Sequence, residues 1–161
     1  MWITLSTYRI IAVVFSQTAE YALRAIVTLA QSEITGKTAH EIADESQVPL
    51  DYLSKVLNSL ARAGIVKAQR GRGGGFTLAS PPSEMTVLDV VNAVEPIRRI
   101  RSCPLKLKAH ATRMCPLHRK LDDALAMVEE AFRSTAIASL CENPDHPALC
   151  GEERYVAITS R

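Results

Sequence analysis

Residues 38–79 read TAHEIADESQVPLDYLSKVLNSLARAGIVKAQRGRGGGFTLA, and the order of signals in this stretch decides the fold. Thr38, with Glu41 three residues later, forms a capping box that predicts the start of a short helix. Residues 46–49, with the sequence SQVP, predict a turn whose proline suits the first turn of a second helix. That helix is predicted over residues 50–63, with an apolar face made of Leu53, Val56, Leu57 and Leu60.

A β-hairpin is predicted directly after this second helix. Its two runs, residues 65–69 and 75–79, are joined by a glycine-rich loop with the sequence RGRGG. Further helices are predicted before and after the unit, over residues 16–32 and 87–94. The order helix, short helix, turn, helix, hairpin is that of a winged helix-turn-helix. We therefore predict a mainly α fold with a small β-hairpin wing.

The second helix and the hairpin carry polar side chains that suit double-stranded DNA. In helix-turn-helix proteins the second helix lies in the major groove, and its first residues reach the base edges. The outward polar positions predicted for this helix are Asp51, Tyr52, Ser54, Lys55 and Asn58. The predicted hairpin tip carries two arginines suited to a minor groove or to phosphates, Arg70 and Arg72. Candidate phosphate contacts elsewhere are Lys67, Arg62 and Arg24.

A long helix is predicted over residues 117–140. Its apolar residues Leu121, Leu125, Val128 and Phe132 are spaced by four, three and four, close to the heptad spacing of a helix–helix interface. Such a seam packs either on the chain's own core or on a second copy, and no other predicted helix is long enough to cover it. We therefore predict that this C-terminal helix holds a homodimer together.

The chain divides into four predicted regions. Residues 1–14 show no helical period and are interpreted as an N-terminal extension, or alternatively as an apolar arm that packs on a partner subunit. Residues 15–82 form the DNA-binding winged helix-turn-helix, and residues 83–140 hold a loop and the dimerisation helix. Residues 141–161 are polar, contain two prolines and are expected to be a flexible tail.

The bulk composition narrows the class of protein. The net charge of +2 does not by itself indicate a nucleic-acid partner. We find neither a secretory signal nor an apolar run long enough for a membrane span, which predicts a cytoplasmic protein without a membrane partner. We also find no nucleophile–base constellation with a motif behind it, so an enzyme is not expected; a metal hydrolase that uses His110 and His118 is a remote alternative.

Four cysteines stand at positions 103, 115, 141 and 150, and none forms a C-x-x-C pair. In a reducing cytosol, spaced cysteines indicate metal or redox chemistry before structural disulfides, although a cysteine can equally be a small buried apolar residue. The pair Cys141 and Cys150, with His146 between them, is either a second weak metal or disulfide site or part of the loose tail.

The sequence resembles the Rrf2 family of transcriptional regulators, which includes IscR-like and NsrR-like proteins. The resemblance begins at residues 15–25, FSQTAEYALRA. It continues through residues 41–43, EIA, then residues 52–53 with 56–57, and then residues 60–66. The most distinctive match is the wing, residues 70–79, RGRGGGFTLA. The resemblance covers residues 15–140 and implies a DNA-binding regulator, most often a repressor.

The resemblance also implies an iron–sulfur cluster in the loop before the dimerisation helix. Cys103 and Cys115 resemble the first and third of the family's three cysteines, but the middle position is occupied by Ala109. His118 resembles the histidine that completes the cluster in IscR-like proteins, and Glu20 aligns with the carboxylate that NsrR-like proteins supply to the partner subunit's cluster. His110, next to the missing cysteine, is a further candidate ligand.

Two interpretations of the signal remain open from the sequence. In the first, Cys103, Cys115 and His118, with His110 or Glu20 as fourth ligand, hold a 2Fe–2S cluster, since histidine replaces cysteine in Rieske centres. The same residues also suit zinc, or thiols that respond to oxidation without any metal. In the second, the protein has no cofactor and responds to a metabolite or to a partner protein, as in the family's cysteine-metabolism branch.

Overall fold

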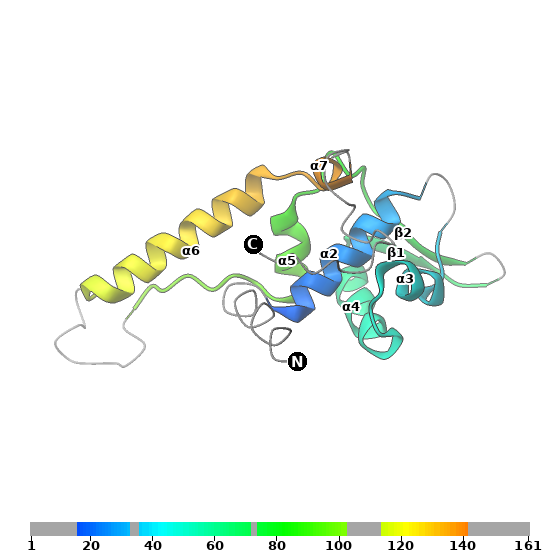
Figure 1. The fold of residues 1–161 in the computed structure, drawn as a ribbon, viewed down its shortest axis with the longest axis horizontal. Helices are drawn as coiled ribbons and strands as arrows, with labels where there is room; N and C mark the ends of the chain where they lie inside the picture. Colours follow the sequence, from blue (N-terminus) through cyan, green and yellow to red (C-terminus); the bar gives the residue numbers. More distant parts are fainter. Residues whose placement is uncertain (1–15, 33–35, 72–73, 103–113, 142–161) are drawn as a thin grey trace, which may run out of the picture.

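The computed structural model describes residues 16–32, 36–71, 74–102 and 114–141 of the 161-residue chain. Six helices and two strands are assigned in these residues: α2 (Gln17–Ala30), α3 (Ala39–Ser46), α4 (Leu50–Arg62), β1 (Val66–Gln69), β2 (Gly75–Leu78), α5 (Val87–Val94), α6 (Pro116–Ser134) and α7 (Ile137–Cys141). The predicted fold class, mainly α with a small hairpin, is confirmed. Figure 1 shows α6 extending to one side of the helical body and the hairpin extending to the other.

Side-chain caps fix where three of the helices begin. The Ser16 hydroxyl accepts a hydrogen bond from the backbone of the first turn of α2. Thr38 and Glu41 form the predicted capping box at the start of α3, and Thr86 forms a second one with Asp89 at the start of α5. Each cap satisfies backbone N–H groups that a helix leaves without an internal partner. These local signals are the reason why the helix starts could be predicted closely.

The core lies where α2, α3, α4 and α5 pack together. Each helix presents one apolar face inward, as the predicted spacing requires. The largest side chains that are fully buried there are Ile26, Ile42, Leu53, Leu57, Leu60, Ile137 and Val90. Since α4 buries one face in this core, its opposite face is free for other contacts.

The predicted long helix over residues 117–140 is confirmed up to residue 134, but it is wrong in having no break before residue 140. The chain leaves the helix at Thr135, which has an extended backbone, and α7 begins two residues later. The Thr135 carbonyl accepts a hydrogen bond of 2.9 Å from the Val87 N–H, and the Ile137 N–H donates one of 2.8 Å to the Met85 carbonyl. The break places Ile137 in the core at 0% exposure. The apolar spacing of the sequence continues across the break and therefore does not indicate that the chain changes direction there.

The hairpin is joined to the helical body by a third segment. Strands β1 and β2 are antiparallel, with Val66 opposite Leu78. The Lys37 N–H donates to the Phe76 carbonyl at 3.1 Å, and the Phe76 N–H donates back to the Lys37 carbonyl at 2.8 Å. A Cβ at Gly75 would lie 2.6 Å from the Lys37 carbonyl oxygen, so this close approach requires glycine.

Residues 96–102, which we call the strap, run alongside α6 (Figure 1). Arg99 makes two hydrogen bonds of 2.7 Å to the Asp122 carboxylate, and a longer contact of 3.5 Å to Glu129. The Ile100 N–H also donates to Asp122 at 2.8 Å. The hydrogen bonds from Arg99 hold the pKa of Asp122 below its usual range. The strap is therefore fixed to the first half of α6.

Candidate nucleic-acid interface and cysteine site

The outer face of α4 is polar and accessible. Asp51, Ser54, Lys55 and Asn58 are all exposed, while the opposite face of the helix is buried in the core. The Ser54 hydroxyl donates to the Leu50 carbonyl one turn earlier, which leaves its oxygen on the helix surface. Lys55 and Asn58 lie one turn apart and line a shallow hollow towards the end of α4. Both side chains are accessible to a ligand on this face.

Tyr52 is held by α2 more firmly than the sequence suggests. Its hydroxyl is 2.9 Å from the Thr18 hydroxyl, and its ring meets the Tyr21 ring edge-to-face with centroids 5.4 Å apart. At 38% exposure, it remains partly accessible. Such contacts brace the first turn of α4 against α2. No sequence spacing indicates this pairing, because Tyr21 and Tyr52 belong to separate helices.

The hairpin adds basic residues beside α4. Along β1 the side chains after Val66 are exposed, and these include Lys67; Arg70, just beyond the strand, is exposed as well. Arg62, at the end of α4, is exposed and donates to the Ser59 hydroxyl at 3.3 Å. The second predicted wing arginine, Arg72, lies outside the described residues.

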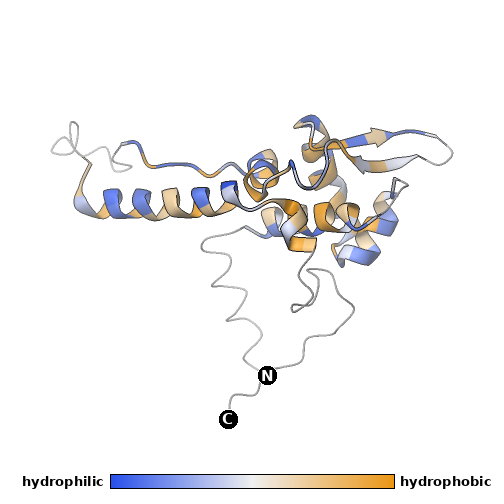
Figure 2. Cartoon of the chain, turned by 90° about the horizontal axis from the view of Figure 1, so that it is seen from above, coloured by the Kyte–Doolittle hydropathy of each residue, from blue (hydrophilic) through white to orange (hydrophobic). Residues whose placement is uncertain are grey.

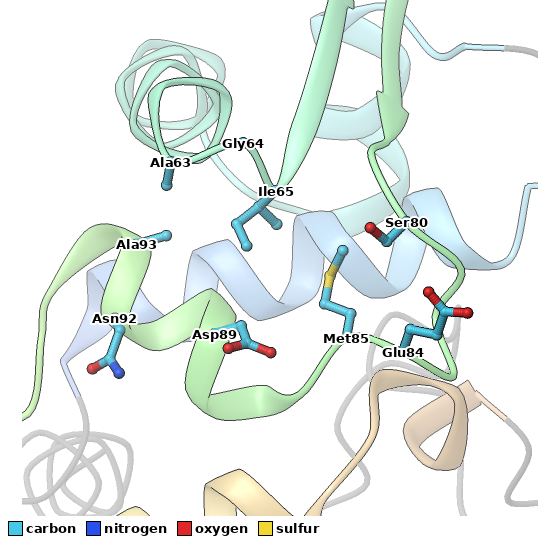
Figure 3. A pocket seen from close by; sticks show the side chains of 9 residues that line it. All are labelled: Ala63, Gly64, Ile65, Ser80, Glu84, Met85, Asp89, Asn92 and Ala93. Atoms are coloured by element: carbon cyan, nitrogen blue, oxygen red, sulfur yellow. The ribbon is translucent and has the colours of Figure 1, made fainter.

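The surface on the other side of the α4–β1 junction has the opposite charge. Figure 3 shows a hollow there, between the end of α4, the base of the hairpin and α5. Its volume is ≈ 370 Å³, and its lining includes the Glu84 and Asp89 carboxylates but no Lys or Arg. A phosphate would be repelled from this hollow, so the hollow itself does not suit DNA.

Glu20 and Arg24, predicted as a cluster ligand and a phosphate contact, pair with each other. Arg24 donates to the Glu20 carboxylate from Nε at 3.1 Å and from Nη2 at 2.8 Å. The residues are one turn apart on α2, and both side chains are about a quarter exposed. Both hydrogen bonds go to Oε1 of Glu20, so the ion pair orients the two side chains and engages only one of the two carboxylate oxygens.

Two of the predicted cluster ligands lie together at the start of α6. Cys115 is the N-cap residue, and its Sγ is 3.1 Å from His118 Nδ1 one turn later. The other loop candidates, Cys103 and His110, lie outside the described residues. Within the described ranges, no group of three or more His, Cys, Asp or Glu side chains is placed to hold a metal ion. Thiolate and imidazole are both ligand types found in iron–sulfur proteins, and the described residues bring these two side chains together.

The C-terminal cysteine pair is described only in part. Cys141, in α7, is half-buried against the core, and its thiol donates to the Ile137 carbonyl at 3.5 Å. Cys150 and His146 lie outside the described residues, as does the N-terminal extension. Where the chain is described, no helix is long and apolar enough to cross a membrane.

The apolar residues of α6 divide between two directions. Leu125 and Phe132 line a cavity of ≈ 140 Å³ together with Ile97 of the strap, so they face the chain itself. Leu117 and Leu121 are 65% and 46% exposed, and none of the α6 side chains is fully buried. Figure 2 shows hydrophilic and hydrophobic residues alternating along this helix. The predicted seam thus has one part covered by the strap and one part open.

Comparisons with known proteins agree with this geometry. The sequence model of the Rrf2 family, described as iron-dependent transcriptional regulators, matches residues 15–143. An HTH-type transcriptional regulator by name, from Aquifex aeolicus, is 30% identical over 130 residues, which cover 79% of this chain and 90% of that protein. The structure of CymR, the global cysteine regulator of B. subtilis, superposes with a TM-score of 0.65 at 25% identity, over 79% of this chain and 95% of that one. IscR of T. potens superposes with a TM-score of 0.64 at 23% identity, over 78% and 83%, and so supports the fold.

Proposed function

Because the chain belongs to the Rrf2 family of transcriptional regulators, we propose that it binds operator DNA as a homodimer through α4 and the hairpin, and that it acts as a cytoplasmic repressor. The observation that carries this proposal is the exposed polar face of α4, with Lys67 on the neighbouring strand β1 and Arg70 just beyond that strand. The inner face of α4 is buried in the core, and Tyr52 in its first turn contacts α2. These contacts hold the outer face of α4 in a fixed position.

The two parts of the interface have different roles. Lys55 and Asn58 lie on a helix that fits the major groove, where lysine recognises guanine and asparagine recognises adenine. Lys67 and Arg70 lie on and beside the hairpin, where basic side chains neutralise phosphates without reading the sequence. Base recognition therefore belongs to α4, and the hairpin supplies affinity and orientation.

Substitutions separate these roles. We expect Lys55→Ala or Asn58→Ala to weaken binding to a selected operator by about 1–3 kcal/mol, with little effect on random DNA. Arg70→Ala should weaken binding to both and lower the salt dependence by about one unit. Fluorescence anisotropy on an operator selected from a random duplex pool measures both effects. Asn92→Ala, in the acidic hollow of Figure 3, is the control that should change neither. Equal losses for Asn58→Ala and Asn92→Ala would remove α4 from the interface.

A second proposal concerns the signal and rests on Cys115 and His118 being 3.1 Å apart. We propose that this pair, with Cys103 and either His110 or Glu20, binds a 2Fe–2S cluster whose redox state or loss changes DNA binding. Thiolate and imidazole are both cluster ligands, and a helical i, i+3 pair brings them to one side of the helix. If Glu20 serves as the fourth ligand, it would do so through Oε2, because Arg24 is bonded to Oε1.

Anaerobic purification tests the cluster directly. We expect visible absorbance with near-equal iron and sulfide in the native protein, and loss of both in Cys115→Ser and in His118→Ala. Cys141→Ser is the matched control that should keep them, because this thiol lies in α7 and bonds to the Ile137 carbonyl. A native protein that stays colourless after reconstitution would exclude the cluster. It would favour a regulator without a cofactor that responds to thiol oxidation, a metabolite or a partner protein.

A further inference from the structure

The positive charge of the chain is concentrated in one segment outside the helix-turn-helix. Residues 96–121 contain eight of the 19 Lys and Arg residues and none of the 17 Asp and Glu residues. The remaining 11 basic residues are therefore outnumbered by acidic ones. Within residues 16–95, which hold α4 and the hairpin, seven Lys and Arg stand against nine Asp and Glu. The region that reads DNA has no net positive charge of its own.

In the described part of this segment, several arginines are exposed to solvent. Arg98 and Arg101 are exposed on the strap, and Arg119 is exposed on the first turns of α6. None of the three forms an ion pair with an acidic side chain of the described residues, although Arg101 is close enough to contribute to the lowered pKa of Asp122. Arg99, in contrast, is paired with Asp122 and fixes the strap to α6.

From this arrangement we infer that Arg98, Arg101 and Arg119 form a second DNA-contacting surface, which binds the phosphate backbone of the same duplex that α4 and the hairpin bind. This inference rests on the proposed DNA-binding function. DNA affinity depends on how many phosphates are neutralised by Lys and Arg, and the region around α4 offers few. Three exposed arginines from a segment that itself contains no Asp or Glu supply additional positive charge.

The position of this surface is compatible with a dimer. Arg119 is two residues before Leu121, so it projects about 200° around α6 from the open apolar face. A second copy that covers Leu121 would leave Arg119 accessible. The strap and α6 extend away from the side of the body that carries the hairpin, so basic groups lie at both ends of the elongated chain (Figure 1). Such a distribution contacts a longer stretch of duplex than α4 and the hairpin reach.

The salt dependence of DNA binding tests this surface. The full-length protein and the variants Arg119→Gln, Arg101→Gln/Arg119→Gln and Arg98→Gln/Arg101→Gln/Arg119→Gln are titrated with a labelled duplex between low and moderate salt. We expect the slope of log K against log salt to fall by about one unit for each arginine removed. Arg133→Gln is the matched control: it removes one exposed arginine from the same helix, but one that is paired with Glu129 and Glu130, and it should leave the slope unchanged.

The outcomes separate this inference from the proposed function. If the native protein binds DNA and the triple variant keeps the native slope, the second surface does not contact DNA and belongs to another partner, such as an acidic protein. A fall for Arg133→Gln equal to that for Arg119→Gln would mean that net charge alone is responsible, which also overturns the inference. If the native protein binds no DNA, the proposed function itself fails. Sedimentation of each variant confirms that the dimer is intact.

Discussion

Leu121→Asp should convert the protein to a monomer and reduce its affinity for operator DNA by about 100-fold, because two linked half-site contacts become two independent ones. Leu121 is 46% exposed, and it shares the open face of α6 with Leu117. In a symmetric dimer, one substitution places two carboxylates in the same apolar interface. Burial of an unpaired charge is among the most costly changes that an interface can undergo.

Sedimentation velocity at micromolar concentration measures the monomer fraction. The control is Met127→Asp, which introduces the same charge at a position that is 74% exposed and about 120° around the helix from Leu121. We expect this variant to remain a dimer. If Leu121→Asp remained dimeric, the interface would lie elsewhere, and the open face of α6 would need another explanation.

Gly75→Ala should detach the hairpin from the helical body. The new Cβ would lie 2.6 Å from the Lys37 carbonyl oxygen, a backbone atom that cannot move away alone. Both hydrogen bonds between Lys37 and Phe76 would be strained or lost. We expect the free energy of unfolding to fall by about 2–3 kcal/mol. Affinity for DNA should fall at least roughly tenfold, because Lys67 and Arg70 would no longer be held beside α4.

The matched control is Gly36→Ala, next to the same bridge. Its Cβ would first meet a methyl group of Thr77 at 3.2 Å, and a side chain can adjust by that amount. Thermal unfolding and anisotropy on the same duplex give the two quantities. If Gly75→Ala retained native DNA affinity despite reduced stability, the position of the hairpin would be unimportant for binding, and its basic residues would not be phosphate contacts.

Local signals account for what the sequence predicts correctly in this fold. These signals are the capping box at Thr38, the apolar face of α4 and the glycine-rich loop. Each involves only residues that are close in the sequence, so it can be recognised without knowledge of the tertiary structure. The end of α6 is different. The chain turns at Thr135 because residues some 50 positions earlier offer backbone partners and a buried place for Ile137.

The candidate site shows the same division. The spacing of α4 correctly indicates which side chains are exposed, since burial of one helical face determines the other. Periodicity does not show that Tyr52 is bonded to Thr18, that Glu20 is paired with Arg24, or that Leu125 faces the strap. Each of these depends on a partner whose place is set by tertiary packing or by one specific rotamer.

The burial of Ile137 also affects how the protein is made. This residue fills the core beside α2, more than 100 positions away in the chain, so the core reaches its full packing only after α7 has been synthesised. Because α6 precedes α7 in the chain, it emerges from the ribosome first, with Leu117 and Leu121 exposed on it. Completion of the helical core and exposure of the proposed dimer surface on α6 therefore occur close together during translation. A nascent chain that is interrupted before residue 137 would have an open core and would be a substrate for chaperones and proteases.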